Sequence, residues 1–469
     1  MGTLTSILDI ARQALTADQL ALNATANNVA NQNTPGYTRE TVSFQSVDSV
    51  SLSGSSQSQG VSATESSQRD RILEQRVQQQ TQTVAQSGAL GSALQQVENI
   101  FGLSSTSSGS ASVSSSELGG AINSFFSSLS SLEGNPSTST RQSVLSAATA
   151  LVGAFNDASN QLAQISTGLN QEVSSDVSQV NSLTSSIASL NAQIASVSPN
   201  GDAGTLEDQR QEDIDQLSQL VGLDQISTSQ NGISLTTSNG AALVSGSQAF
   251  QMSTTQVGGN TNVLAGYPPQ DVTSSLTGGD MGGALQARDQ NLSAYSSALD
   301  SLAFAIGNAV NTQNEQGADS SGNPGQAIFS LPSSATGAAA SIAVSATGPG
   351  AIAAASTGEG SSGNENATAL ANLSTADIVG SQTATEFLSS LLGQIGSEAS
   401  GVTTYNTAQQ AALTQLTTQR DSLSGVSLDQ EAANLTQYQR SYQAASQVFT
   451  IADALMASAI NLGVQTSVT

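Results

Sequence analysis

The stretch LDQEAANLTQYQRSYQAASQVFTIADALMASAINL, residues 428–462, decides the fold of this chain. Its apolar side chains recur at spacings of seven, three and four residues, the pattern of an amphipathic helix. The main residues of this stripe are Leu428, Leu435, Tyr438, Tyr442, Phe449, Leu455, Met456 and Leu462. A helix of this length extends about 50 Å. The stripe is wider than a two-stranded coiled coil needs, so we expect it to contact more than one neighbour and to serve assembly.

The beginning of the chain carries a similar pattern. Residues 3–31 are predicted to form a helix with Asp18 and Thr25 as polar exceptions within its apolar stripe. The apolar positions are Leu4, Leu8, Leu15, Leu22 and Val29. Neither terminal helix can bury its stripe alone, so we expect the two to pair. After the second of them, Gly463 is the predicted helix end.

Helical periodicity also covers most of the sequence between the two ends. The predicted helices are residues 69–101, 118–132, 138–197, 205–221, 276–314 and 388–423. The stretch 138–197 is the longest, and it predicts a rod of roughly 80 to 90 Å. The fold class is therefore mainly α with small β subdomains, an elongated multi-helix bundle that resembles a coiled coil. Its chain runs out and back, so that the paired terminal helices lie at one end.

Three regions lose the helical period. Residues 223–275 alternate around the turn-forming dipeptides Asn231-Gly232 and Asn239-Gly240, so they are predicted to form small hairpins. Residues 41–68 fit either short strands or a loosely packed arm. Residues 317–366, rich in Gly, Ser and Ala, predict short strands and loops.

These patterns divide the chain into four parts. Residues 1–40 and 425–469 form a terminal helical coiled-coil domain. Residues 41–222 and 280–424 form the elongated helical bundle with irregular arms. Residues 223–275 are a small β hairpin domain, and residues 317–366 are a reduced insertion of strands and loops.

Composition excludes several functions. The formal net charge is -25, and all ten basic residues are Arg, so nucleic acid and anionic membranes are poor partners. The chain has no Cys, His or Trp, which excludes disulfides and metal sites built from thiolate or imidazole. The first residues lack the basic and apolar regions of a cleaved secretory signal, and no stretch is apolar enough to span a membrane. Any export must use another route.

The residue types available leave little room for catalysis. Without His, Cys or Lys, Ser-His-Asp, Cys-His and Ser-Lys sites cannot form. Two carboxylates are sufficient for a glycosidase, and Asp208, Glu212 and Asp215 share one helix face. At this spacing, the preferred interpretation is a solvated acidic stripe near Arg210. We therefore expect no enzyme activity, no cofactor and no metal.

The two ends of the chain together resemble the paired terminal signature of bacterial flagellar axial proteins, the rod, hook and hook-associated group. The N-terminal motif is ANNVANQNTPGY, and its matching residues are Asn27, Asn28, Asn31, Thr34, Pro35, Gly36 and Tyr37. Its partner is the C-terminal stretch quoted above. In the middle, LEDQRQEDIDQLSQLVGL at 206–223, the GGDMGGALQ segment and GAIAAASTG at 350–358 resemble the hook-associated members. Each segment is weak evidence alone, and the ordered set is specific.

The resemblance implies a structural subunit that joins hook to filament and is located in the extracellular flagellum. It implies unfolded secretion through the flagellar type III export apparatus and assembly into a helical ring through the terminal helices. The implied partners are other copies of the chain, hook protein, hook-associated protein 3 and a cytoplasmic chaperone on the C-terminal helix. One departure from the family is a compressed region at 317–350, which implies a reduced or missing outer domain.

Other readings remain open from the sequence. A hook or distal rod protein would share both ends of this chain. Outside this group, a secreted coiled-coil adhesin or a glycosidase that uses carboxylates would share the elongated helices or the acidic residues.

Overall fold

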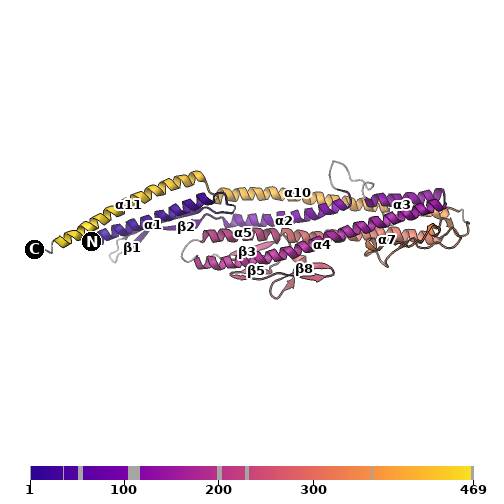
Figure 1. Ribbon diagram of the computed structural model, residues 1–469, viewed down its shortest axis with the longest axis horizontal. Coiled ribbons are helices and arrows are strands. Elements are labelled where there is room, and N and C mark those ends of the chain that lie inside the picture. The colour runs from indigo at the N-terminus through magenta and orange to yellow at the C-terminus, as the bar shows by residue number, and fades with distance from the viewer. Residues whose placement is uncertain are drawn as a thin grey trace.

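The computed structural model describes residues 2–34, 36–50, 56–103, 117–197, 203–227, 232–360 and 363–465. The molecule is elongated, and the two ends of the chain lie together at one tip (Figure 1). A narrow terminal unit at this tip continues into a longer bundle of helices, with small sheets along one side. The predicted fold class is confirmed: long helices dominate, and the sheets are few and small.

The terminal unit consists of two helices and a hairpin. Its elements are α1 (Gly2–Asn31), β1 (Glu40–Val50), β2 (Ser56–Ser67) and α11 (Leu428–Gln465). The helices α1 and α11 pack side by side and run in opposite directions (Figure 1). The strands pair antiparallel and pack on α1, so residues 41–68 form a hairpin rather than a loosely packed arm of the bundle. The helix α11 continues past Gly463, which was wrongly predicted to end it.

The bundle is organised along α4 (Thr138–Val197), which has 60 residues and therefore a length of about 90 Å. The other long helices are α2 (Arg71–Ile100), α3 (Glu117–Gly134), α5 (Gly204–Leu220), α7 (Ser293–Gln316) and α10 (Ala384–Ser424). The helix α6 (Gly279–Gln286) continues through the π-helical turn η4 (Ala287–Leu292) into α7. These helices bear out the helical stretches predicted from periodicity.

The heptad pattern of α4 supplies much of the core. Phe155, Leu162, Val173 and Ile187 are at most 1% exposed, so the predicted stripe is indeed buried. Each fully buried apolar side chain contributes about 1.5 to 3 kcal/mol relative to exposure. Asp176 stands in the same stripe and is buried as well, which makes it an exception within an otherwise apolar interface.

Two small antiparallel sheets lie along α4. The first has the order β3-β4-β5-β6 and the second β7-β8-β9, as predicted for residues 223–275. The elements are β3 (Leu223–Ser227), β4 (Ile233–Thr237), β5 (Ala242–Ser245), β6 (Gln248–Ala249), β7 (Ser253–Val257), β8 (Asn260–Ala265), β9 (Gln270–Asp271) and η3 (Thr273–Ser275). Gly240, at φ +86°, makes the predicted turn before β5, whereas Asn231 lies outside the described residues.

The end of the bundle farthest from the chain termini is built from short pieces. They are β10 (Gly317–Ala318), β11 (Phe329–Ser330), α8 (Ala338–Ser341), β12 (Ala343–Val344), η5 (Pro349–Ala351), β13 (Ala355–Ser356) and α9 (Glu365–Asn372). Ile328, Phe329, Ile342 and Ile352 are at most 1% exposed and belong to the main core. The compressed region 317–350 is therefore packed into the end of the bundle.

Candidate assembly surface

Small side chains let the terminal helices and the hairpin approach closely. Ala11, Ala17, Ala21 and Ala24 of α1 and Ala452 of α11 are at most 3% exposed. Of the predicted apolar positions of α1, Leu4, Leu8, Leu15 and Leu22 are half-buried and Val29 is exposed. The closest packing of α1 is therefore made by alanines, which periodicity alone ranked below the leucines.

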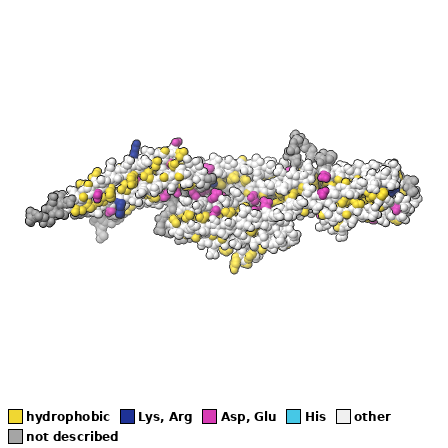
Figure 2. All heavy atoms as spheres, viewed as in Figure 1, with side chains coloured by type: hydrophobic (Ala, Val, Ile, Leu, Met, Phe, Trp, Pro, Cys, Tyr) yellow, Lys and Arg dark blue, Asp and Glu magenta, His cyan; other side chains and the backbone are white. Residues whose placement is uncertain are grey.

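The predicted stripe of α11 is divided between two environments. Leu435, Tyr438 and Met456 are half-buried. The remaining large apolar residues of the helix are exposed: Leu428 by 49%, Tyr442 by 38%, Val448 by 48%, Phe449 by 36%, Ile451 by 62%, Leu455 by 53% and Ile460 by 52%. The side chain of Leu462 lies outside the described residues. Figure 2 shows hydrophobic side chains along this end of the molecule. A large apolar face of α11 thus has no partner within the described chain.

The N-terminal motif forms a hydrogen-bonded turn rather than part of the apolar face. The buried Asn28 donates from Nδ2 to Glu40 O at 2.8 Å, and its Oδ1 accepts from Glu40 N at 2.9 Å and from the Tyr37 hydroxyl at 3.0 Å. Burial raises the pKa of Tyr37 above its ordinary value, which keeps this donor protonated. The motif therefore fixes the angle at which the chain leaves α1 and enters the hairpin.

The remaining motif residues complete the turn. Asn31 Nδ2 donates to Asn27 O at 3.1 Å, and Thr34 N donates to Asn31 O at 2.9 Å. Gly36 has φ +78°, a conformation that favours glycine. Pro35 lies outside the described residues.

Polar contacts join the terminal unit to the bundle. Arg39 Nε binds Glu431 Oε1 at 2.8 Å within the terminal unit, and Arg39 N donates to Ser424 O of α10 in the bundle at 2.9 Å. Thr38 N donates to Asp208 Oδ2 at 3.0 Å, and the other oxygen of this carboxylate accepts from Arg69. Residues from both ends of the chain and from α5 therefore meet at one junction.

The sequence interpretation of the acids on α5 was partly wrong. Glu212 is exposed, as expected of a solvated stripe, but Asp208 and Asp215 are partly buried at the junction. Arg210 is only 3% exposed and donates to Asn191 Oδ1 at 2.9 Å. Burial against α4, α2 and the residues that follow α1 therefore changes what these side chains do.

The junction encloses a cavity of about 430 Å³ lined by residues that include Glu74, Asp215 and Arg420. Burial raises the pKa of Glu74 to about 7, although Arg69 acts in the opposite direction. Burial likewise raises the pKa of Asp215 to about 6. The pKa values of these two carboxyl groups at the junction therefore lie close to neutral pH.

Sequence reasoning missed the pairing of Arg39 with Glu431. A signal for it was present, because Glu431 stands seven residues before Tyr438 and so falls in the apolar stripe of the C-terminal helix. A charged residue at such a position requires a partner when it is buried. Periodicity cannot identify that partner when it lies 392 residues away.

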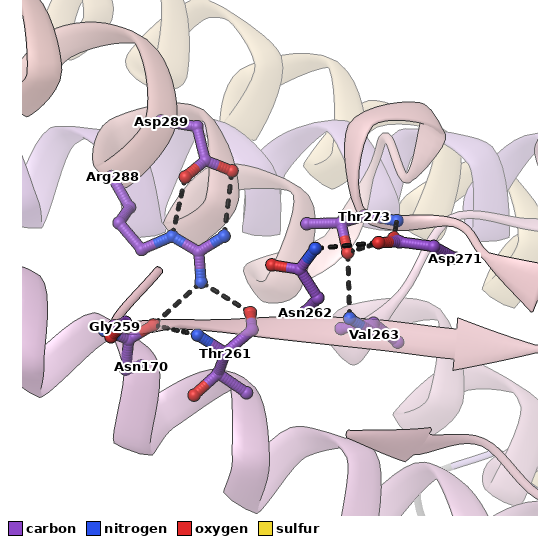
Figure 3. Close-up of polar contacts among 9 residues, drawn as sticks. All are labelled: Asn170, Gly259, Thr261, Asn262, Val263, Asp271, Thr273, Arg288 and Asp289. Carbon is purple, nitrogen blue, oxygen red and sulfur yellow. Dashed lines mark hydrogen bonds and ion pairs between the residues drawn. The ribbon is translucent and has the colours of Figure 1, made fainter. Parts of the chain in front are cut away.

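A second polar network attaches the sheet β7-β8-β9 to the bundle (Figure 3). The buried Arg288 binds both carboxylate oxygens of Asp289, and its Nη1 donates to Asn170 Oδ1 at 2.8 Å and to Thr261 O at 2.6 Å. Asn170 Oδ1 also accepts from Thr261 N at 2.7 Å. The side chains of Asn170 on α4 and Arg288 on η4 therefore hold the start of β8 against α4.

Within the described residues, no cluster of three or more acidic, His or Cys side chains has a geometry that could hold a metal ion. None of the helices described there is long and apolar enough to cross a membrane. The polar clusters described above join elements to one another. The exposed apolar side chains of α11 have no such role within the described residues.

Three family models match this chain. Residues 94–329 match the flagellar hook-associated protein FlgK helical domain. Residues 8–38 match the flagella basal body rod protein model, and residues 418–462 match the flagellar basal body rod FlgEFG protein C-terminal model. The last two matches cover the two segments that pack together in the terminal unit.

Curated relatives match over nearly the whole length. Flagellar hook-associated protein 1 of Bacillus subtilis is 30% identical over 502 residues, covering 97% of both chains. The protein of the same name from Salmonella typhimurium is 27% identical over 567 residues, covering 98% of this chain and all of the relative. The solved flagellar hook junction protein FlgK of Burkholderia pseudomallei has the same fold, with a TM-score of 0.67 and 20% identity over 74% of this chain and all of that one.

Proposed function

This chain belongs to the flagellar hook-associated protein 1 family, the structural proteins of the hook-filament junction, and we propose that it joins hook to filament as one subunit of a helical ring built through α1 and α11. It is a component of the flagellum and assembles with other flagellar proteins. We propose different roles for the terminal unit and for the rest of the chain. The terminal unit makes the ring, and the bundle with its sheets faces outward from it.

The exposed apolar face of α11 carries this proposal. Four of its residues, Val448, Ile451, Leu455 and Ile460, are each about half exposed or more, although α11 is already paired with α1. A soluble monomer rarely leaves so many large apolar side chains exposed on one helix, and such exposed apolar surface marks protein contacts. Contacts between different patches of identical copies build rings or helices.

The proposed partners are other copies of the chain, hook protein, hook-associated protein 3, the flagellar type III export apparatus and a cytoplasmic chaperone on α11. A chain without cysteine cannot be trapped by disulfides while it crosses the export channel unfolded. The apolar face of α11 is also the part of the chain that most needs cover before assembly. Both features are compatible with unfolded export and with protection by a chaperone.

We also propose that the protein has no enzyme activity. Asp208, one of the three carboxylates considered for catalysis from the sequence, accepts hydrogen bonds from Thr38 and Arg69 at the junction. Its relatives are named as structural flagellar proteins. The adhesin and glycosidase alternatives therefore have no observation in their favour.

The experiment is to change exposed apolar residues of α11 in the full chain. Phe449→Ser with Leu455→Ser leaves the packing against α1 largely intact, because both side chains are substantially exposed. We expect normal folding and loss of incorporation into flagella of a strain that lacks its own copy. The matched control is Tyr267→Ser, which removes a 90% exposed aromatic residue beyond the terminal unit. Normal incorporation of the double variant would refute the proposed role of α11.

Antibody labelling of flagella separates the remaining alternatives within the group. A hook or distal rod protein would be labelled along the hook or beneath it. The proposal requires labelling at the boundary of hook and filament.

A further inference from the structure

The exposed apolar residues of α11 lie on two separate flanks of the helix. One row contains Val448, Ile451 and Leu455, which follow each other at spacings of three and four residues. The other contains Tyr442, Phe449 and Ile460, at spacings of seven and eleven. Seven and eleven residues correspond to about two and three helical turns, so each row keeps to its own side. We call these rows flank A and flank B.

The contact with α1 separates the two flanks. Ala452 is 3% exposed, and it stands four residues after Val448 of flank A and three after Phe449 of flank B. Residues three and four apart are neighbours on a helix surface. Ala452 therefore lies between the rows, and each flank remains open on one side of the helix pair.

Each flank carries one charge, and the two charges are opposite. Arg440 stands eleven residues before Ile451 and extends flank A. Asp453 stands eleven residues after Tyr442 and seven before Ile460, within flank B. They are the only charged residues of α11 after Glu431, both are exposed, and neither has an ion-pair or hydrogen-bond partner in the described part of the chain.

We propose that flank A of one copy packs against flank B of the next, and that Arg440 of the first copy pairs with Asp453 of the second. This inference rests on the proposed function, since it names the contact by which copies assemble. Two different faces with complementary charge make a heterologous contact, which builds a ring or helix instead of a closed pair. A parallel, in-register contact of flank A with flank A would bring two Arg440 side chains together. The charges thus select the copy-to-copy geometry, while the apolar rows supply the affinity.

Charge reversal tests the pairing in the full chain. Arg440→Glu and Asp453→Arg each place like charges opposite each other, and each is expected to lower the self-association constant about 3- to 10-fold per contact. The combined variant Arg440→Glu with Asp453→Arg restores an opposite pair, so it should associate within about twofold of the parent. Sedimentation velocity measures association, and circular dichroism checks that each variant folds. The matched control is Arg76→Glu on α2, the same change at an exposed arginine of the bundle.

Each outcome has a defined meaning. Weakened single variants with a restored double variant support the pairing, and a larger loss of association with salt in the parent than in Arg440→Gln with Asp453→Asn supports it as well. Single variants that associate normally, or a double variant that is not restored, would overturn it. So would normal association combined with lost binding of the export chaperone, since the flanks would then serve that partner. The proposed function fails separately, if Phe449→Ser with Leu455→Ser still assembles.

Discussion

Arg39 Nε binds Glu431 Oε1 at 2.8 Å, and this ion pair ties the residue just before β1 to the first turn of α11. The Glu431 side chain is only 1% exposed and that of Arg39 is 17% exposed, so solvent screens the pair weakly. The pair fastens the N-terminal part of the terminal unit to its C-terminal helix, next to the bond from Arg39 N to Ser424 O of the bundle.

Removing Arg39 should therefore loosen the terminal unit. Arg39→Met leaves the buried Glu431 without its partner, which we expect to cost about 2 to 3 kcal/mol. Hydrogen exchange should quicken in the first turns of α11 while α4 stays protected. The control is Arg39→Met with Glu431→Met, which removes both charges and should recover much of the loss. Equal exchange in the parent and the single variant would show that the pair contributes nothing.

The junction should become less stable as pH rises. The pKa of Glu74 is raised from 4.5 to about 7 by burial, and that of Asp215 from 3.8 to about 6. Because the folded protein binds these protons more tightly than the unfolded chain, their contribution is fully present below about pH 4 and is lost as pH rises through 6 and 7. The free energy of unfolding, measured in urea, should decrease by about 1 to 2 kcal/mol from pH 5 to pH 8. In Glu74→Gln the decrease should be smaller, and an unchanged slope would argue against this role of Glu74.

Asp176 should destabilise the bundle at alkaline pH. Its Oδ2 is buried and has no hydrogen-bond partner among the described residues, and burial, with Glu172 and Asp280 nearby, raises its pKa to about 7. Ionisation above this pH places an unpaired charge in the α4 interface. Asp176→Leu matches the apolar residues around it and should raise the free energy of unfolding by about 2 kcal/mol at pH 8, and by less at pH 5. If Asp176→Leu were less stable than the parent at pH 8, the Asp176 carboxylate would have to have a stabilising partner or a function.

Arg288 should hold the sheet β7-β8-β9 on the bundle. Arg288→Met removes the group that donates to Asn170 Oδ1 and to Thr261 O. The first acceptor is partly buried and the second is buried, and both would lose this hydrogen bond. We expect a loss of about 2 to 4 kcal/mol and faster amide exchange at Thr261 and along β8. Asp289→Asn is the matched control, since Asp289 is 36% exposed and its change leaves the contact with α4 in place. Protection of β8 in Arg288→Met would contradict the assignment.

The sequence by itself determined the helices, because their apolar period is a local property of the chain. The helix α4 is the clearest case, since Phe155, Leu162 and Ile187 stand at heptad positions and all are fully buried. The terminal stripes predicted that the chain ends pair, and the width of the stripe in α11 predicted surface left over for neighbours. Both follow from counting apolar residues on one face of a helix.

Tertiary structure alone decided which side of each stripe is covered and which polar groups meet. Ala452 is buried while Leu455, three residues later, is 53% exposed, because α1 packs closely on the side of α11 that carries Ala452. Arg210 donates to Asn191, and Arg39 binds Glu431, which is 392 residues away in the sequence. The physical reason is that burial and charge pairing depend on distances between segments that the folded backbone brings together, whereas periodicity records only the order within one segment.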